Sequence, residues 1–197
     1  NRSFAYLCNG DFVRGWPEYE WRWKVKPFKG GKEPGTRWDG SELNGKSVLI
    51  TAEQGLGDSI NFIRYATLAK ARGAKVIFDC PVPLASLIKT CPGVDTVVPR
   101  GQPGPPFDYY FPLLSLPGLL GSSSQPTVQI PYFQPDPDRV AYWKDLVNDI
   151  PGVRVGIAWQ GSKAHKGDKL RSVPLTRFAP LAAIPGVSLC SIQKPPG

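Results

Sequence analysis

The chain has 197 residues, of which 41% are hydrophobic, and its formal net charge is +8. This composition is typical of a folded protein with a packed core, and no apolar run is long enough to span a bilayer. The four cysteines form no C-x-x-C pair and the single histidine has no cysteine nearby, which argues against a zinc site. Reduced thiols and the lack of a visible signal peptide favour a cytoplasmic location. The chain begins at Asn1 without any methionine, so we expect it to be part of a longer protein.

Residues 1–24 predict short helices separated by a break at Asn9-Gly10-Asp11. Pro17 is expected in the first turn of a helix, where proline is tolerated. Helices this short cannot bury their apolar faces alone, so the segment is interpreted as the end of a helical repeat array. Residues 25–46 are rich in glycine and proline and predict a linker, which Trp38 is expected to anchor on a neighbouring surface.

The centre of the chain predicts a β-α-β unit. Ser47–Ala52 predicts a strand, and an amphipathic helix is expected from Asp58 to Ala71 after a glycine-containing turn. Lys75–Phe78 predicts the next strand, parallel to the first. Ligands gather at the carboxyl ends of parallel strands, so the loop from Glu53 to Asp58 is expected at the ligand edge of the sheet.

The glycine turn fits more than one interpretation. Gly55 and Gly57 supply the first two glycines of a dinucleotide-binding G-x-G-x-x-G motif, and Asp79 could stand for its ribose-binding acid, but Ile60 holds the third glycine position. Asp58 at the helix start would repel a pyrophosphate, which makes this hypothesis the weaker one. Asp58 itself predicts either a helix N-cap or a carboxylate that takes a proton from a sugar hydroxyl, and both roles remain open.

The remaining elements of the first domain follow in order. The pattern predicts a helix over Pro83–Thr90, strands over Val94–Val98 and Phe107–Phe111, and a helix over Asp138–Asn148. Pro112–Pro117 is expected at the carboxyl end of the last strand, on the ligand side of the sheet. The Asp138–Asn148 helix is expected to carry an apolar face and to bridge two domains.

A second parallel unit is predicted from residue 151 onward. Val153–Trp159 and Val187–Ile192 predict strands of a separate sheet, with a helix opened by Pro174 between them. Seven basic residues and one acid follow Val153, which suits phosphate binding, although a solvated basic face has the same composition. Further strands would have to cover this sheet, so Trp159 and Ile192 are expected to be exposed or covered by a partner, and the isolated chain is expected to be marginally stable or to associate.

Several motifs together resemble one family. Ala52-Glu53-Gln54-Gly55-Leu56-Gly57-Asp58 with Phe62-Ile63-Arg64-Tyr65 is similar to the first strand, loop and helix of heptosyltransferase-like (family nine) glycosyltransferases fused to tetratricopeptide repeats. Pro112–Pro117, Val155–Gly161 and Ser191–Lys194 resemble later blocks of that family. The stretch from Gly10 to Trp23 resembles the closing piece of bacterial tetratricopeptide-repeat proteins.

The resemblance implies an α/β fold class, with a Rossmann-like parallel-sheet domain of GT-B type. A short helical repeat remnant precedes this domain, and the start of a second Rossmann-like domain follows it. The implied boundaries are 1–24 for the helical remnant, 25–46 for the linker, 47–150 for the acceptor domain and 151–197 for the beginning of the nucleotide-sugar domain. The later donor-binding region of the family is absent from this sequence.

The resemblance also implies functional residues. Asp58 is the candidate base that deprotonates the acceptor hydroxyl, and Gln54, Gly55 and Gly57 are candidate acceptor-binding residues. The candidates for binding the donor phosphates are Gly161, Ser162, Lys163, Lys166 and Arg171. Neither a metal nor a cofactor is implied, because the nucleotide-sugar is a substrate, and the acceptor would be a glycan, a lipid or a protein.

Three functions are therefore weighed. The first is transfer of a sugar from a nucleotide-sugar donor to an acceptor hydroxyl. The alternative is a catalytically inactive GT-B-like binding or scaffold protein in a larger assembly, with a protein partner on the helical segment, since a fold does not imply a function. A nucleic-acid binder is disfavoured, because the basic segment lacks interleaved aromatic residues for base stacking.

Overall fold

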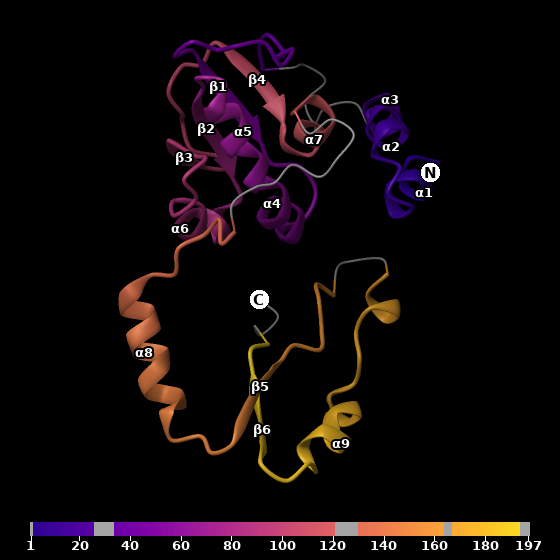
Figure 1. The fold of residues 1–197 in the computed structure, drawn as a ribbon, viewed down its shortest axis with the longest axis vertical. Helices are drawn as coiled ribbons and strands as arrows, with labels where there is room; N and C mark the ends of the chain where they lie inside the picture. Colours follow the sequence, from indigo (N-terminus) through magenta and orange to yellow (C-terminus); the bar gives the residue numbers. More distant parts are fainter. Residues whose placement is uncertain (1, 26–33, 121–129, 164–166, 194–197) are drawn as a thin grey trace. The chain divides into compact units, whose positions relative to one another are not determined.

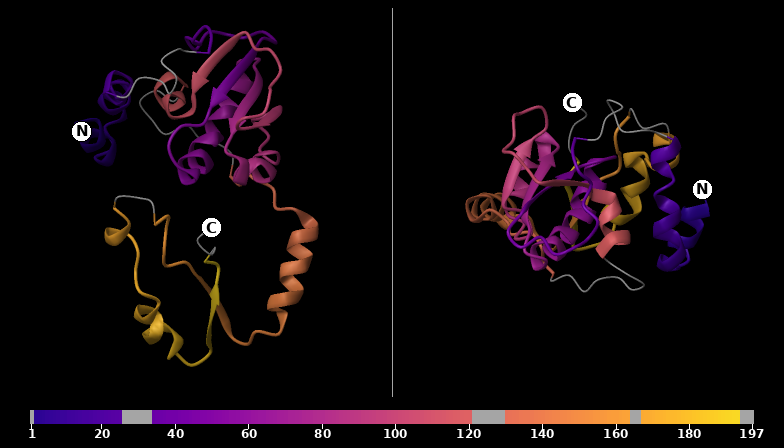
Figure 2. Two further views of the ribbon diagram at one scale, coloured as in Figure 1. Left: turned by 180° about the vertical axis from the view of Figure 1, so that it is seen from behind. Right: turned by 90° about the horizontal axis from the view of Figure 1, so that it is seen from above.

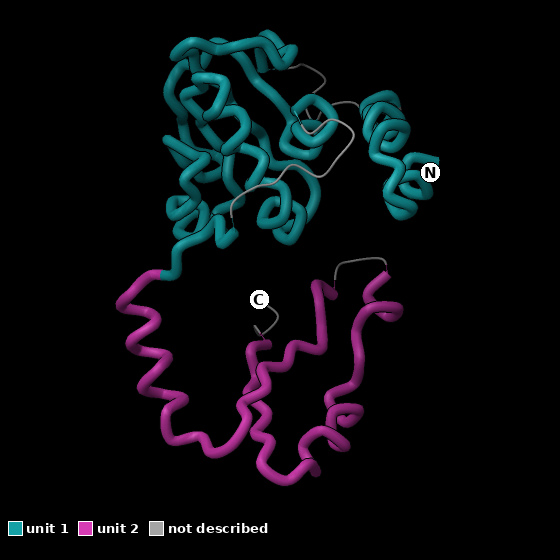
Figure 3. Tube along the Cα trace, in the orientation of Figure 1, with its two compact units in different colours: residues 1–135 teal, residues 136–197 magenta. Residues whose placement is uncertain are grey.

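The computed structural model describes residues 2–25, 34–120, 130–163 and 167–193. The chain divides into two compact units, residues 1–135 and residues 136–197 (Figure 3). The first unit contains a four-stranded sheet and the second a two-stranded sheet, and all strand pairs in both sheets are parallel. The predicted α/β class with two separate parallel sheets is therefore confirmed.

Figure 1 labels helices and strands of both units. The first unit includes, in chain order, α1 (Arg2–Cys8), α2 (Phe12–Tyr19), α3 (Arg22–Val25), β1 (Ser47–Thr51), α4 (Leu56–Phe62), α5 (Ala66–Ala71), β2 (Lys75–Cys80), α6 (Ala85–Ile88), β3 (Thr96–Pro99), β4 (Tyr109–Pro112) and α7 (Leu116–Leu120). The second unit includes α8 (Pro137–Asn148), β5 (Val153–Ile157), α9 (Ala179–Ala182) and β6 (Val187–Ser191). Short 3-10 turns cover Ile63–Tyr65, Val82–Leu84, Leu113–Ser115, Asp168–Leu170 and Leu175–Phe178.

The helices α1 and α2 form a hairpin that turns at Gly10, as the sequence predicted. Gly10 has a φ of 75°, a left-handed conformation that glycine adopts without strain. Asp11 caps α2, since its carboxylate accepts a hydrogen bond of 3.1 Å from the backbone N–H of Arg14. The prediction that Pro17 lies in a first turn is wrong. The helix already begins at Phe12, because Asp11 supplies the cap, and Pro17 lies inside it.

The first sheet has the strand order β3-β2-β1-β4. Val48 of β1 is in register with Val76 of β2 on one side and with Tyr109 of β4 on the other. The prediction that the segments now assigned to β1 and β2 are parallel neighbours is confirmed. The chain places β2 and β3 on one side of β1 and then returns to place β4 on the opposite side, so the order of strand addition reverses between β1 and β4.

The main core lies against one face of this sheet. Val48, Ile50 and Phe78 have no exposed surface, and they share one hydrophobic cluster with Ala66 of α5 and Ile88 of α6. Figure 1 shows α5 lying over the strands, and Figure 2 shows the same sheet from two other sides. Burial of these apolar side chains is the main stabilising contribution to the first unit.

The helical crossover between β1 and β2 differs from the prediction of one helix from Asp58 to Ala71. It begins at Leu56, and a 3-10 turn over Ile63–Tyr65 separates α4 from α5. Gly73, with a φ of 77°, follows the end of α5, as expected for a glycine that stops a helix.

Trp38 anchors the linker on the sheet, and this prediction is confirmed. Its side chain is 1% exposed, its ring meets Phe111 edge-on at 6.2 Å, and its indole N–H donates to the Ser41 carbonyl at 3.0 Å. The backbone beside it pairs with β4, because Trp38 N–H donates to the Tyr110 carbonyl and Tyr110 N–H donates to the Thr36 carbonyl, both at 2.9 Å. The linker therefore extends the edge of the sheet.

The N-terminal helices pack directly on the sheet domain. The Trp16 ring of α2 meets the Phe62 ring of α4 edge-on, with 6.1 Å between their centroids. Gly118 of α7 allows α2 to approach closely, since a Cβ added there would lie 3.1 Å from Trp16 Cβ. The helical segment and the sheet thus belong to one unit.

The second unit has little buried apolar surface. Ile157 of β5 is 7% exposed, but Trp143 and Leu146 of α8 are 57% and 53% exposed. The predicted apolar face of this helix is therefore solvent-accessible in the structure. Ile192 is 69% exposed, which confirms that prediction, whereas Trp159 is half-buried.

The second sheet pairs Val153 with Val187. Just before the two strands, the backbone of Gly152 lies against that of Gly186, because a Cβ added to Gly152 would lie 2.1 Å from the Gly186 carbonyl oxygen. The contacts of α8, which Asp136 caps through the N–H groups of Asp138 and Arg139, place this helix with the second unit. The sequence placed the domain boundary after α8, at residue 150, whereas the structure divides the chain before α8, at residue 136. In the described parts of the chain, no helix is long and apolar enough to cross a membrane.

Candidate functional site

The loop between β1 and α4 carries the candidate base. Gly55 is the N-cap residue of α4, and Asp58 is its third residue rather than the N-cap that the sequence suggested. The Asp58 carboxylate reaches back and accepts the Gly55 N–H through Oδ2 at 2.9 Å, as in a capping box. The side chain is half-buried, and its Oδ1 has no hydrogen bond to any described residue. One carboxylate oxygen therefore holds the turn and the other can accept a proton.

Glu53, at the start of the same loop, is bound by Arg22 of α3. The Arg22 Nε lies 3.0 Å from Oε2 and its Nη2 lies 3.1 Å from Oε1, so the two side chains form a two-pronged ion pair. The Leu114 N–H also donates to Oε1 at 3.0 Å. The Arg22 guanidinium lies over the rings of Tyr19 and Trp23, at 4.4 and 4.5 Å from their centroids. The two charged side chains are therefore largely enclosed by protein.

Ser115, in the turn after β4, extends the ion pair into a network. Its hydroxyl accepts from Arg22 Nη2 at 2.6 Å and donates to Glu20 Oε1 at 2.7 Å. Glu20 also accepts from Arg22 Nη1 at 2.7 Å and from Arg37 Nη2 at 2.6 Å. We call these five residues, Glu20, Arg22, Arg37, Glu53 and Ser115, the arginine network. It joins the helical segment, the linker, the loop after β1 and the turn after β4.

The pKa shifts within the arginine network follow from its geometry. Burial alone would raise the pKa of the Glu20 carboxyl, but hydrogen bonds from Ser115, Arg22 and Arg37 outweigh burial and hold this pKa below its ordinary value. Burial alone would lower the pKa of Arg22, but its pairing with Glu53 and Glu20 outweighs that effect and raises the pKa. Both residues are therefore charged at neutral pH.

The arginine network lies where the strand order of the sheet reverses. In open parallel sheets, ligands bind outside the carboxyl ends of the strands at this position. Here the Arg22 guanidinium itself bridges Glu53, which follows β1, and Ser115, which follows β4. The chain thus supplies its own cation at the place where many α/β proteins bind a ligand.

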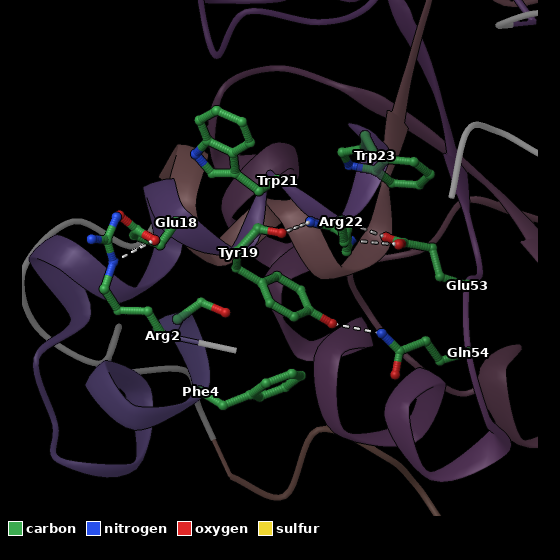
Figure 4. A pocket seen from close by; sticks show the side chains of 10 residues that line it. Arg2, Phe4, Glu18, Tyr19, Trp21, Arg22, Trp23, Glu53 and Gln54 are labelled. Carbon is green, nitrogen blue, oxygen red and sulfur yellow. Dashed lines mark hydrogen bonds and ion pairs between the residues drawn. The ribbon is translucent and has the colours of Figure 1, made fainter. Parts of the chain in front are cut away.

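A pocket of about 880 Å³ lies beside the network, between the N-terminal helices and the loop after β1. It is lined by Arg2, Ser3, Phe4, Glu18, Tyr19, Trp21, Arg22, Trp23, Glu53 and Gln54. Figure 4 shows the Gln54 amide directed at the Tyr19 hydroxyl, to which it donates at 2.6 Å. Burial raises the pKa of the Tyr19 phenol, and the negative charges of Glu53 and Asp58 add to this effect. The Tyr19 hydroxyl therefore keeps its proton.

The predicted acceptor-binding residues occupy different positions in this arrangement. Gln54 lies in the wall of the pocket, whereas Gly55 and Gly57 lie in the exposed loop. A Cβ added to Gly57 would meet nothing within 4 Å, and one added to Gly55 would meet only Asp58 Oδ2. The protein itself does not require glycine at position 57, so a close approach of a ligand to this backbone stays a prediction.

The acid considered for ribose binding, Asp79, is already paired. Arg100 Nη2 lies 3.0 Å from its Oδ2 and also donates to the Ala52 carbonyl at 2.6 Å. This ion pair links the ends of neighbouring strands and gives Asp79 a structural partner.

In the second unit, the residues predicted to bind phosphate are brought together in part. The Arg171 guanidinium lies against Gly161, since a Cβ added to Gly161 would lie 2.9 Å from Arg171 Nη2. Gly161 N–H donates to the Ser172 hydroxyl at 3.4 Å, and that hydroxyl donates to Asp168 at 2.6 Å. Ser162 and Lys163, which follow Gly161, are exposed to solvent, and Lys166 lies outside the described residues. In the described part of the chain, no group of three or more His, Cys, Asp or Glu residues could hold a metal ion.

The sequence motifs include the segments of the arginine network but gave no functional prediction for Arg22, Glu20 or Ser115. A usable signal was present, because Glu20 and Arg22 are charged residues within an aromatic run that ends in Trp23. Charged residues among large apolar ones have to be paired when the apolar residues are buried. The partner of Arg22 could not be identified, since Glu53 is 31 positions away.

Comparison with known proteins gives a distant relative but no fold assignment. The chain is 28% identical over 214 residues to Protein FlbA of Caulobacter vibrioides, a match that covers 98% of this chain and 36% of that protein. The chain thus spans about a third of the length of this relative. No family model and no solved structure matches the chain.

Proposed function

We propose that this chain is part of a glycosyltransferase of GT-B type, which transfers a sugar from a nucleotide-sugar to an acceptor hydroxyl without a metal ion. The first unit would be the Rossmann-like acceptor domain, and the second unit would begin the nucleotide-sugar domain. The helices α1 to α3 would close a tetratricopeptide array. The resemblance of the sequence to heptosyltransferase-like enzymes suggests each of these assignments.

The observation that carries the proposal is the position of Asp58. The loop that holds it follows β1 at the carboxyl edge of a parallel sheet, next to the point where the strand order reverses. Only one of its carboxylate oxygens is used by the capping hydrogen bond to Gly55 in the described structure. A carboxylate held in place through one oxygen is suited to general-base catalysis through the other.

The proposed reaction uses Asp58 as the base. Its free oxygen accepts the proton of the acceptor hydroxyl while the hydroxyl oxygen forms a bond to the anomeric carbon of the donor sugar. The bond from that carbon to the phosphate oxygen breaks, and the nucleotide leaves with its electron pair. Lys163, Lys166 and Arg171 would stabilise the charge on the leaving phosphate, which is the role a divalent cation has in other enzymes. No cofactor takes part, because the nucleotide-sugar is a substrate.

A cytoplasmic location belongs to the same proposal. The four cysteines of the chain are free thiols, with Cys80 and Cys91 buried. Free thiols are stable in a reducing compartment, where nucleotide-sugars would be the donors.

The proposal is tested by assaying the longer protein for release of nucleotide from a panel of nucleotide-sugars, with and without the substitution Asp58→Asn. Asparagine can still accept the Gly55 N–H through its side-chain carbonyl, so the free energy of unfolding is expected to change by less than about 1 kcal/mol. Turnover is expected to fall about 10²- to 10⁴-fold, the usual contribution of a general base. A variant with wild-type turnover would leave Asp58 with a capping role only.

A second candidate function is a binding or scaffold protein without catalysis. It is favoured by one observation: Arg22 bridges the loops after β1 and β4, where a ligand would bind in many parallel-sheet proteins. Because Arg22 fixes the helical segment to the sheet domain, the surfaces of the helices and of the sheet domain could be presented together to one partner. Absence of transfer with every donor, in a protein that still binds a partner through its helices, would favour this function.

A further inference from the structure

The pocket between the N-terminal helices and the loop after β1 has a charge-balanced wall. Its four charged lining residues form two pairs: Arg2 with Glu18, and Arg22 with Glu53. The Arg2 Nε lies 3.1 Å from Glu18 Oε2, and the second pair is the two-pronged contact of the arginine network. Each guanidinium is already bound to a carboxylate, so the pocket offers no unpaired cation to a phosphate.

The polar groups that remain lie around Tyr19. The Tyr19 hydroxyl accepts a hydrogen bond from the Gln54 amide N–H, and no described residue accepts the hydroxyl proton itself. Because the phenol keeps its proton, it can donate to a ligand. The Gln54 side-chain oxygen has no partner among the described residues and can accept. The pocket therefore presents one donor and one acceptor next to each other, and both are uncharged.

Aromatic surface flanks these polar groups. Phe4 of α1 is 55% exposed and Trp21 is 58% exposed, although both line the pocket. Lys24 lies over the Trp21 ring, with its Nζ 3.9 Å from the centroid, whereas Phe4 contacts Tyr19 edge-on at 5.8 Å. Figure 4 shows Phe4 and Gln54 near the Tyr19 hydroxyl. An aromatic ring beside neutral hydrogen-bonding groups suits a ligand with one apolar face and several hydroxyl groups.

We propose that this pocket binds an uncharged sugar ring. The C–H face of the ring packs on Phe4, and ring hydroxyls bond to the Tyr19 hydroxyl and to the Gln54 amide oxygen. A phosphorylated ligand is disfavoured, because Glu53 and Glu18 would repel it and both arginines are already paired. An entirely apolar side chain is disfavoured, because it would leave the Tyr19 hydroxyl and the Gln54 oxygen without partners.

The size of the pocket agrees with this ligand class, since about 880 Å³ lies within the range of small-molecule sites and exceeds one sugar ring. The assignment of this sugar to the acceptor rests on the proposed function, because Gln54 directly precedes the loop that carries Asp58. Binding of the sugar itself is independent of transfer and can be measured without a donor.

The experiment is a ligand-observed NMR titration of the full-length protein with methyl glycosides of neutral hexoses and N-acetylhexosamines. The same sugars as 6-phosphates and N-acetylphenylalanine amide serve as competing ligand classes. At least one neutral glycoside is expected to bind saturably in the millimolar range, and its 6-phosphate at least tenfold more weakly. Tighter binding of the phosphate or of the phenylalanine amide would overturn the proposal, as would the absence of saturable binding by every neutral glycoside.

Variants locate the site. Phe4→Ala and Tyr19→Phe are each expected to weaken binding about fivefold or more, the scale of one lost contact or one neutral hydrogen bond. Val13→Ala and Tyr142→Phe are the matched controls, since both parent residues are exposed and neither lines the pocket, and they are expected to leave the affinity unchanged. Unchanged affinity in both pocket variants would overturn the proposal. Because Phe4 is more than half exposed, its replacement does not threaten the fold.

The variant Asp58→Asn separates this inference from the proposed function. It is expected to retain sugar binding while transfer is lost. Sugar binding in a protein without any transferase activity would reject the proposed function and keep the sugar site. If the protein binds no neutral sugar, and Phe4→Ala and Tyr19→Phe transfer sugar at the wild-type rate, the sugar site alone would be rejected.

Discussion

Arg22 and Glu53 lie 31 positions apart in the sequence and meet in a two-pronged ion pair, with Nε–Oε2 and Nη2–Oε1 distances of 3.0 and 3.1 Å. Their side chains are 17% and 11% exposed, so the pair is largely removed from water. Arg22 comes from the helical segment and Glu53 from the loop that leads to Asp58. The ion pair therefore couples the helices to the candidate catalytic loop.

Replacing Arg22 should be costly for this reason. The variant Arg22→Ala leaves the Glu53 carboxylate with the Leu114 N–H as its remaining donor among the described residues, and breaking a buried pair from one side costs about 3–5 kcal/mol. We expect this loss in the free energy of unfolding measured by urea denaturation. The matched control is Arg14→Ala, whose parent side chain is 66% exposed and pairs with Asp11, and which should cost much less than Arg22→Ala.

A double-mutant cycle tests whether the effect comes from the pair. Arg22→Ala combined with Glu53→Ala should destabilise the protein by clearly less than the sum of the single variants, because each single variant leaves a buried charge without its partner. Additive losses would mean that Arg22 stabilises the protein through its contacts with Tyr19, Trp23 or Glu20 instead.

The same network predicts a pH dependence of stability. The pKa of the Glu20 carboxyl is held below its ordinary value of 4.5, because hydrogen bonds from Ser115, Arg22 and Arg37 outweigh the effect of burial. The folded protein therefore retains the charged form at a pH where the unfolded chain binds a proton. The resulting contribution to stability is present above about pH 4.5 and is lost as the pH falls through the lower folded-state pKa.

The measurement is the free energy of unfolding between pH 6 and pH 3, for the wild type and for Glu20→Gln. The variant cannot ionise at this position, so its stability should fall less steeply over this interval. Equal slopes for the two proteins would show that Glu20 has the same pKa in the folded and unfolded chain.

The sequence predicted the strands of both sheets because each is a short run of β-branched or apolar residues bounded by glycine or proline, as in Ser47–Thr51 and Val187–Ser191. It also predicted the burial of Trp38, since a large aromatic residue in a polar linker needs a surface to pack on. It could not predict the 3-10 turn at Ile63–Tyr65, because the apolar spacing there is compatible with a continuous helix. The Pro17 error had a similar origin, since proline marks a helix start only when no better cap lies upstream, and Asp11 does.

The candidate site was predicted less completely than the fold. The position of the loop from Glu53 to Asp58 at the carboxyl end of β1 followed from the β-α-β pattern. The contacts of Glu53 did not, because its partner belongs to a helix that precedes the linker, and local periodicity contains no information about such long-range pairs. The capping bond of Asp58 to Gly55 was anticipated in kind but not in position, since Gly55 rather than Asp58 is the N-cap residue.

The cysteines give a prediction that reports on the first unit directly. Burial raises the pKa of the Cys80 thiol to about 11, and the neighbouring Asp79 carboxylate adds to this effect, whereas Cys8 is exposed on α1. At pH 8, Cys8 should react with an aromatic disulfide reagent within minutes, whereas Cys80 should react only after denaturant is added. The measurement is the number of protein thiols that have reacted as a function of time, in the native wild-type protein and in native Cys8→Ser. If the rapid phase in Cys8→Ser has the amplitude of a further thiol in addition to Cys190, a buried cysteine, Cys80 or Cys91, reacts in the native protein, which would show that the core of the first unit opens readily.

The last prediction concerns Arg171 and the donor phosphates. Its guanidinium lies against Gly161, at the end of the segment that follows β5, and a guanidinium can bind two phosphate oxygens at once. In the longer protein, Arg171→Ala should weaken nucleotide-sugar binding by about 1.5–3 kcal/mol, the scale of a hydrogen bond to a charged group. The matched control is Arg177→Ala, an exposed arginine in the Leu175–Phe178 turn of the same unit, which should leave the affinity unchanged. Calorimetric titration of donor and acceptor into each variant is the measurement, and acceptor binding should not change in Arg171→Ala, because the proposed acceptor site lies in the first unit. Equal losses for both ligands would mean that Arg171 supports the fold of the loop, and its proposed phosphate contact would have to be abandoned.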